Sequence, residues 1–80
     1  MSEEWFKSNK WLIWDFEHMQ WWKPNALGYT ADKQLAGVFG YEDAYQCLWR
    51  ANRVNTRAAL VLPDDYTQTR YFPPGYNVTN

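Results

Sequence analysis

The aromatic content of this chain limits how it can fold more than any other feature of its sequence. Its 80 residues include six tryptophans, six tyrosines and four phenylalanines, which together make up 20% of the chain. A chain of this length forms one domain and buries only a little over ~60% of the surface that its unfolded form exposes. Each large aromatic side chain buries roughly 150–250 Å². We therefore expect a small core that cannot hold every ring, so that several rings lie at the surface, in a pocket or in an oligomer contact.

The charge of the chain bears on its possible partners, and its cysteine content bears on its disulfides. The net charge is −1, and the basic residues are spread along the chain except for a loose set formed by Arg50, Arg53 and Arg57. Duplex nucleic acid is disfavoured as a partner, because many phosphates require clustered Lys and Arg. The single cysteine, Cys47, cannot form an internal disulfide, and neither a signal sequence nor a run of ~18 apolar residues is present. We expect a cytoplasmic protein without a membrane span.

The first half of the chain has the pattern of strands joined by a turn. Residues 10–18 are rich in aromatic and β-branched side chains and predict a strand that is covered on both sides in its first half. Pro24 and Asn25 mark a turn, after which residues 26–30 return as a second strand. Thr30 then caps a helical turn that Gly37 ends in the left-handed conformation.

The second half contains the clearest helix. It is expected at residues 41–53, where apolar side chains recur at the i, i+3, i+4 and i+7 spacing of one helix face. This face consists of Ala44, Cys47, Leu48 and Ala51. Residues 58–63 are an apolar run closed by proline and predict the last strand. The fold class is therefore α+β, with an antiparallel sheet of three or four strands packed on one main helix. Residues 1–9 form an N-terminal arm, residues 10–62 the domain, and residues 63–80 an irregular tail.

Residues 11–62 also contain a series of short sequence motifs in a fixed order. An aromatic strand ends in Glu-His and is followed by Trp-Trp-x-Pro, by Gly-Tyr-Thr, and later by Ala-Gly-x-aromatic before an acidic helix start. The matching positions are Trp14, Glu17, His18, Trp21, Trp22, Pro24, Gly28, Tyr29, Thr30, Ala36, Gly37, Phe39, Glu42, Ala44, Ala51 and Asn52.

This series resembles a group of short, uncharacterised proteins of tailed bacteriophages and prophages. Gly40 departs from that pattern where a Ser or Thr cap is expected, and Phe16 departs from it where a small polar residue is usual. The resemblance implies a phage origin and a role in host takeover or in countering host defence. It implies no known reaction.

Catalytic and metal sites are disfavoured. Glu17 and His18 are neighbours that point to opposite faces of a strand, which favours a structural His18 bonded to a backbone carbonyl near the turn over a catalytic pair. One histidine and a cysteine on a helix face do not make a recognisable set of metal ligands. The glycines match no phosphate loop, and no serine lies in a nucleophile elbow. We therefore predict no enzymatic activity, no metal and no cofactor.

The Trp21-Trp22 pair suggests a binding site instead. Adjacent residues on an extended segment face opposite ways, so one ring can anchor the core while the other is presented outward. In an unbroken register Trp14 shares a face with Trp22, although a bend at Met19 would change this. A bracing role for these rings in a small sheet is the alternative.

An outward Trp beside Lys23, Asn25 and Tyr29 offers a stacking plane, a cation and an amide. These groups suit a nucleobase with a phosphate, and they equally suit a hot spot of a protein interface. On the helix, Trp49 points away from the apolar face and lies near Tyr45, so the tail or another chain is expected to cover this flank.

Two hypotheses follow for a non-enzymatic protein of the host cytoplasm. In the first, it counters host defence by sequestering a nucleotide-like small-molecule signal in an aromatic pocket. In the second, it inhibits a host defence enzyme or receptor through an exposed Trp/Tyr patch. A minor third reading is a domain for single-stranded nucleic acid. The predicted binding residues are Trp14, Glu17, His18, Trp21, Trp22, Lys23, Asn25, Tyr29 and Thr30, with Tyr45 and Trp49 as a possible contact in a homo-oligomer.

Overall fold

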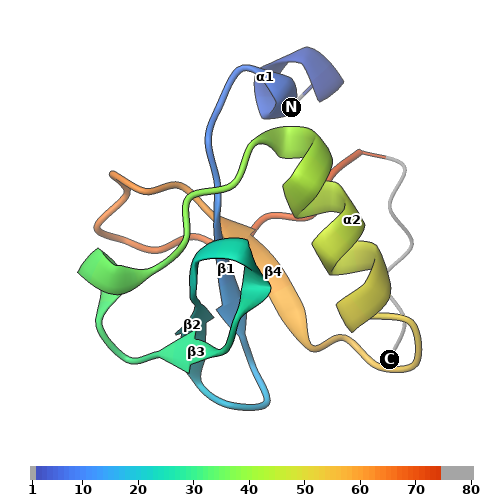
Figure 1. Ribbon diagram of the computed structural model, residues 1–80. Coiled ribbons are helices and arrows are strands. Elements are labelled where there is room, and N and C mark those ends of the chain that lie inside the picture. The colour runs from blue at the N-terminus through green and yellow to red at the C-terminus, as the bar shows by residue number, and fades with distance from the viewer. Residues whose placement is uncertain (1, 75–80) are drawn as a thin grey trace.

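Figure 1 shows the computed structural model, which describes residues 2–74. Its elements in chain order are α1 (Glu3–Lys7), β1 (Leu12–Asp15), β2 (Gln20–Trp22), the 3-10 turn η1 (Pro24–Ala26), β3 (Tyr29–Thr30), the 3-10 turn η2 (Lys33–Leu35), α2 (Tyr41–Ala51) and β4 (Ala58–Val61). The strands form a four-stranded antiparallel sheet in the order β3-β2-β1-β4. The helix α2 packs against this sheet near β4 (Figure 1). The predicted α+β domain with one main helix is confirmed.

The aromatic segment forms a hairpin. β1 ends at Asp15, residues 16–19 make a tight turn in which Met19 has a φ of 54°, and β2 begins at Gln20. The expectation of one strand over residues 10–18 is therefore wrong, because the chain already reverses once before the turn at Pro24.

This reversal also changes which rings share a face. Trp14 lies opposite Trp21 in the β1–β2 ladder, and residues directly opposite each other in an antiparallel pair project to the same side. Trp14 therefore shares a face with Trp21, and Trp22 lies on the other face. The expected pairing of Trp14 with Trp22 is wrong because the bend at Met19 shifts the alternation.

Apolar side chains of β1 are buried on both faces of the sheet. On the face covered by α2, Trp11 and Ile13 join a core that consists of Phe6, Trp11, Ile13, Phe39, Tyr41, Ala44, Leu48, Ala58 and Leu60. On the other face, a smaller cluster consists of Leu12, Trp21, Ala36 and Val61. The prediction that the first half of this strand is covered on both sides is confirmed.

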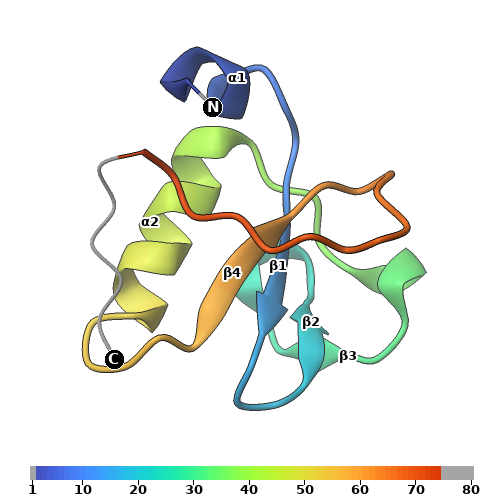
Figure 2. The same ribbon diagram turned by 180° about the vertical axis from the view of Figure 1, so that it is seen from behind.

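The segments before and after residues 10–62 pack against this core. The carbonyl of Phe6 in α1 accepts a hydrogen bond of 2.9 Å from Trp11 Nε1. Tyr71 exchanges two backbone hydrogen bonds with Leu60, so the chain after β4 loops away and returns beside that strand (Figure 2). The rest of the predicted tail, residues 75–80, lies outside the described residues.

The helix α2 ends earlier than predicted. It stops at Ala51, and the buried Asn52 leaves the helical conformation to bond the chain that follows. The side-chain oxygen of Asn52 accepts hydrogen bonds from the N–H groups of Arg57 (2.6 Å) and Ala58 (2.8 Å), and its nitrogen donates to the Ala58 carbonyl (2.9 Å). These bonds fix the loop between α2 and β4.

The expected helical turn after Thr30 is also different. Thr30 belongs to β3, and Asp32 caps η2 instead by accepting a hydrogen bond of 2.9 Å from the Gln34 N–H. Gly37 does not adopt a left-handed φ. Its N–H donates to the Trp22 carbonyl at 2.8 Å, and a Cβ on Gly37 would lie 2.9 Å from both the Lys23 carbonyl oxygen and the Pro24 Cα. Close backbone approach is therefore the reason for glycine at this position.

Replacing Gly37 with alanine is expected to lower the free energy of unfolding by about 1–3 kcal/mol, because backbone atoms must move to admit the methyl group. Gly40→Ala is a matched control, since the nearest neighbour of its added Cβ is the flexible end of Lys10 at 3.9 Å. We expect the control to change stability by less than about 1 kcal/mol. Urea unfolding of both variants measures the difference, and equal effects would contradict the close approach.

Candidate functional site

His18 is held by a carboxylate that the β1–β2 turn brings beneath it. Asp15 is fully buried, and its Oδ2 accepts a hydrogen bond of 2.8 Å from the His18 backbone N–H and lies 2.5 Å from His18 Nδ1. A carboxylate oxygen accepts hydrogen bonds, so this contact favours the tautomer of His18 that carries the proton on Nδ1. The expectation that His18 bonds a backbone carbonyl is wrong, because the tight turn places Asp15 within reach.

The His18 ring begins a row of aromatic rings on the α2 side of the sheet. It stacks on Tyr29 with a centroid distance of 3.9 Å and an interplanar angle of 17°. Tyr29 in turn meets Trp22 edge-on at 6.4 Å. Trp22 is half-buried against the larger core, and its Nε1 is buried without a hydrogen-bond partner among residues 2–74. The structure thus brings together His18, Trp22 and Tyr29 from the predicted site.

Trp14 and Trp21 lie on the opposite face, where they support the sheet. Their rings meet edge-on at 4.8 Å, and only 3% of Trp21 is exposed. The Lys33 ammonium lies 5.8 Å from the Trp21 ring and the Arg70 guanidinium 5.1 Å from the Trp14 ring. These two tryptophans are therefore separated by the sheet from the row that contains His18.

The remaining predicted residues are dispersed. Glu17 pairs with Arg57 at 3.0 Å rather than with His18. Lys23 is exposed, and the Thr30 hydroxyl oxygen accepts a hydrogen bond of 3.1 Å from the Asp32 N–H. Asn25, with a φ of 59°, lies in η1 and faces a different feature of the molecule, a cleft.

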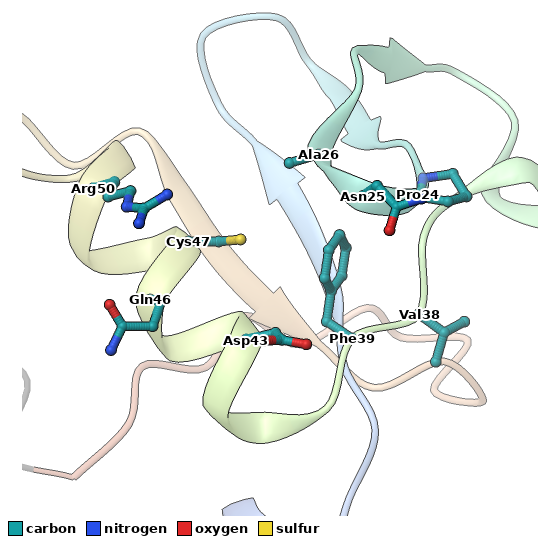
Figure 3. A pocket seen from close by; sticks show the side chains of 9 residues that line it. All are labelled: Pro24, Asn25, Ala26, Val38, Phe39, Asp43, Gln46, Cys47 and Arg50. Atoms are coloured by element: carbon teal, nitrogen blue, oxygen red, sulfur yellow. The ribbon is translucent and has the colours of Figure 1, made fainter.

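This cleft lies between η1 and α2 and has a volume of about 530 Å³ (Figure 3). Its walls are formed by Pro24, Asn25, Ala26, Val38, Phe39, Asp43, Gln46, Cys47 and Arg50. In Figure 3 the Phe39 ring stands between the helix and the η1 turn, and the Cys47 sulfur points into the space between them. Asn25 is the one member of the predicted site that lines the cleft.

A sequence signal for this cleft exists in α2. Asp43, Gln46, Cys47 and Arg50 follow the i, i+3, i+4, i+7 spacing, so they form a second, mostly polar stripe beside the buried one. Cys47 was expected on the apolar stripe, and it packs at the edge of the larger core, while its polar neighbours were not among the predicted site residues. The opposite wall could not be read from local spacing, because residues 24–26 and 38–39 belong to separate segments of the chain.

The chemical state of Cys47 follows from its position in the cleft. Burial raises the pKa of the Cys47 thiol, the Asp43 carboxylate raises it further, and the Arg50 guanidinium opposes both. The side chain is therefore a neutral thiol near pH 7. A neutral thiol is a poor nucleophile, so Cys47 has little covalent reactivity near pH 7.

Within residues 2–74, no group of three or more His, Cys, Asp or Glu side chains is arranged to hold a metal ion. None of the helices in that range has the length and apolar character that spanning a bilayer requires. Comparisons with protein-family models, curated proteins and solved structures found no match to this chain.

The Asp15–His18 contact can be tested against the neighbouring acid. Asp15→Ala removes the acceptor for the His18 backbone N–H and ring, and we expect it to lower the free energy of unfolding by about 1–3 kcal/mol. Glu17→Ala should cost at most about 1 kcal/mol, because the pair with Arg57 is exposed. In both the wild type and Glu17→Ala, nitrogen NMR of the neutral His18 imidazole should show the tautomer that carries the proton on Nδ1. The opposite ranking of the two variants would refute the assignment.

Proposed function

We propose that this protein is a non-enzymatic binding protein that holds a small, flat, nucleotide-like ligand in the cleft between η1 and α2. The observation that carries the proposal is the cleft itself. Its volume of about 530 Å³ falls in the range of roughly 300–1,000 Å³ that is typical of small-molecule sites, and its walls mix apolar surface with a few polar groups.

The wall chemistry suits a heterocycle that carries negative charge. Phe39 offers a ring for apolar contact with a flat ligand. The side-chain amides of Asn25 and Gln46 each provide donors and an acceptor for the edge of a base. Arg50 places a guanidinium at one end of the cleft, where an anionic substituent is favoured.

Both walls are tied to the core, which reduces the ordering that binding requires. Ala44 and Leu48 anchor α2 and are fully buried. The start of the η1 turn is held against Gly37, whose N–H bonds the neighbouring Trp22 carbonyl and whose backbone closely approaches Pro24. A site that is formed before the ligand arrives retains more of its interaction energy as affinity.

The proposal differs in one respect from the pocket expected from the sequence. The cleft contains Phe39 as its aromatic ring, whereas the row of His18, Tyr29 and Trp22 lies elsewhere on the α2 side of the sheet. In this proposal Trp21 and Trp22 do not contact the ligand, since neither lines the cleft, and the ligand contacts come from the η1 turn and α2.

The biological setting of the proposal comes from the motif resemblance to phage and prophage proteins. In that setting the protein acts in the cytoplasm of the infected host and counters defence by sequestering a nucleotide-like signal. Native mass spectrometry of protein purified from a defence-expressing host tests this part, because a retained small molecule would be seen directly as added mass.

Cys47 is a built-in reporter for occupancy of the cleft, since it is the single cysteine of the chain. We expect a bound nucleotide to slow alkylation of Cys47 in a panel of adenosine, guanosine, their mono- and diphosphates and cyclic dinucleotides. Because the pKa of the thiol is raised, alkylation is slow at neutral pH and accelerates as the pH rises through that pKa. Alkylation is therefore best followed at alkaline pH, where a larger fraction of the thiol is ionised.

Variants connect this protection to the cleft walls. Asn25→Gly keeps the positive φ while removing the amide, and Gln46→Ala removes the other amide; each should weaken binding by roughly 0.5–1.5 kcal/mol, the net worth of a hydrogen bond. Glu42→Ala is the matched control on the same helix, since Glu42 does not line the cleft. Absence of protection by every member of the panel would refute the small-ligand proposal.

A second candidate function is supported by the opposite flank of α2. Trp49 is 56% exposed, the Arg53 guanidinium lies 6.0 Å from its ring, and Val54 is 76% exposed. Tyr45 instead packs against the larger core. Exposed Trp and Arg together are typical of protein hot spots, so this flank suits a protein partner or a second copy of the chain.

Trp49→Ala should change the free energy of unfolding by less than about 0.5 kcal/mol, whereas Leu48→Ala, on the buried face, should lower it by about 2–5 kcal/mol. If the flank joins two copies, light scattering of the wild type will show a mass above 9.6 kDa, and Trp49→Ala will restore the monomer. A monomeric wild type would rule out the homo-oligomer.

A further inference from the structure

We propose that Arg50, Arg53 and Arg57 form a binding site for a phosphate-type oxyanion at the C-terminal end of α2. These residues line a hollow of about 380 Å³ together with Ala51 and Val54. The oxyanion site stands on its own geometry, while its link to the cleft rests on the function proposed above.

The loop after α2 is what brings the third arginine to this hollow. Arg50 and Arg53 lie near the end of α2, and Arg57 lies at the end of the loop that joins α2 to β4. The buried Asn52 side chain accepts a hydrogen bond from the Arg57 N–H at 2.6 Å and so folds the loop back against the helix. Three arginines that are loosely spaced in the sequence therefore line one hollow.

Their charges are poorly compensated. The Arg57 guanidinium has one acidic partner, the exposed Glu17 at 3.0 Å, and its Nε is buried without a hydrogen-bond partner in the described part of the chain. Neither Arg50 nor Arg53 forms an ion pair with a described residue. Arg53 lies near the Trp49 ring, a contact that does not neutralise its charge. Like charges gathered without counter-charges favour an external anion.

Stabilisation of the helix end is a competing explanation for two of these residues. Positive side chains near a helix C-terminus interact favourably with its roughly half-unit negative charge. This accounts for Arg50 in the last turn and for Arg53 just beyond it. It does not account for Arg57, which follows the loop and lines the same hollow. Even with Glu17 and the helix end included, three guanidinium groups leave the hollow positive.

Guanidinium groups select the class of anion. Their N–H donors form a planar fork that matches the oxygens of phosphate and carboxylate in pairs. Arg50 lines both this hollow and the cleft beside η1, so an anion here lies next to whatever occupies the cleft. The combination fits a phosphorylated nucleoside, with its ring in the cleft and its phosphates among the arginines.

Pyrophosphate is the probe for the oxyanion site, because it carries the negative charge of a nucleoside diphosphate without the nucleobase. Calorimetric titration at low ionic strength should show saturable binding to the wild type. Arg50→Gln and Arg53→Gln should each weaken it about tenfold, the effect of losing one hydrogen bond to a charged group. Arg70→Gln is the matched control, since Arg70 lies over Trp14 on the other face of the sheet and should leave the affinity within about twofold.

A gain-of-function variant guards against effects of misfolding. Glu17→Gln removes the carboxylate that competes for Arg57, so we expect pyrophosphate to bind several-fold more tightly. Added salt should reduce this binding in every variant, because exposed charges are screened. Equal losses in Arg70→Gln and Arg50→Gln, weaker binding in Glu17→Gln, or no saturable binding to the wild type would each overturn the proposal.

Comparison of two probes separates this site from the cleft. ADP should bind more tightly than pyrophosphate, and Gln46→Ala should remove that advantage while leaving pyrophosphate binding unchanged. If pyrophosphate binds and no nucleotide protects Cys47, the oxyanion site holds and the proposed function fails. If adenosine protects Cys47 and pyrophosphate does not bind, the cleft holds and the oxyanion site is refuted.

Discussion

The burial of Trp11 is the contact on which the rest of the structure depends. Its side chain is fully buried, its indole N–H donates to the Phe6 carbonyl, and its backbone exchanges hydrogen bonds of 2.8 and 2.7 Å with Phe39. Its ring also packs against Trp5 and Tyr71. One large side chain thus joins the N-terminal helix, the first strand, the segment before α2 and the segment after β4. In a chain this short, such a contact replaces the deeper core of a larger domain.

Packing of this kind explains where the aromatic side chains lie that a single core could not hold. Rings that are too numerous for one core are divided between the two faces of a sheet that is buried on both sides at β1. Trp49 is the one tryptophan with more than half of its surface exposed among residues 2–74. Packing on both faces of the sheet therefore accounts for most of the aromatic residues of this small domain. The candidate binding surfaces are formed by side chains around that core.

The helix α2 links the core to both candidate surfaces. Its buried stripe, represented by Ala44 and Leu48, holds it on the sheet. The adjacent stripe contributes Gln46 and Arg50 to the wall of the cleft, and the helix end carries arginines of the second hollow. Since both surfaces share Arg50, changes in helix position would alter them together. The Asn52 bonds that end the helix therefore matter for the site as well as for stability.

Local periodicity in the sequence was sufficient to predict the main helix, the last strand and the two-sided burial of β1, because each reflects neighbours within a few residues. The turn at residues 16–19 was missed, since the strong strand pattern of the flanking residues continues through it. That turn decides that His18 meets Asp15 and that Trp14 shares a face with Trp21. The cleft and the arginine hollow likewise depend on where the chain reverses. Only the tertiary structure could place η1 opposite α2 or bring Arg57 beside Arg50, because these contacts join residues whose separation along the chain carries no periodic signal.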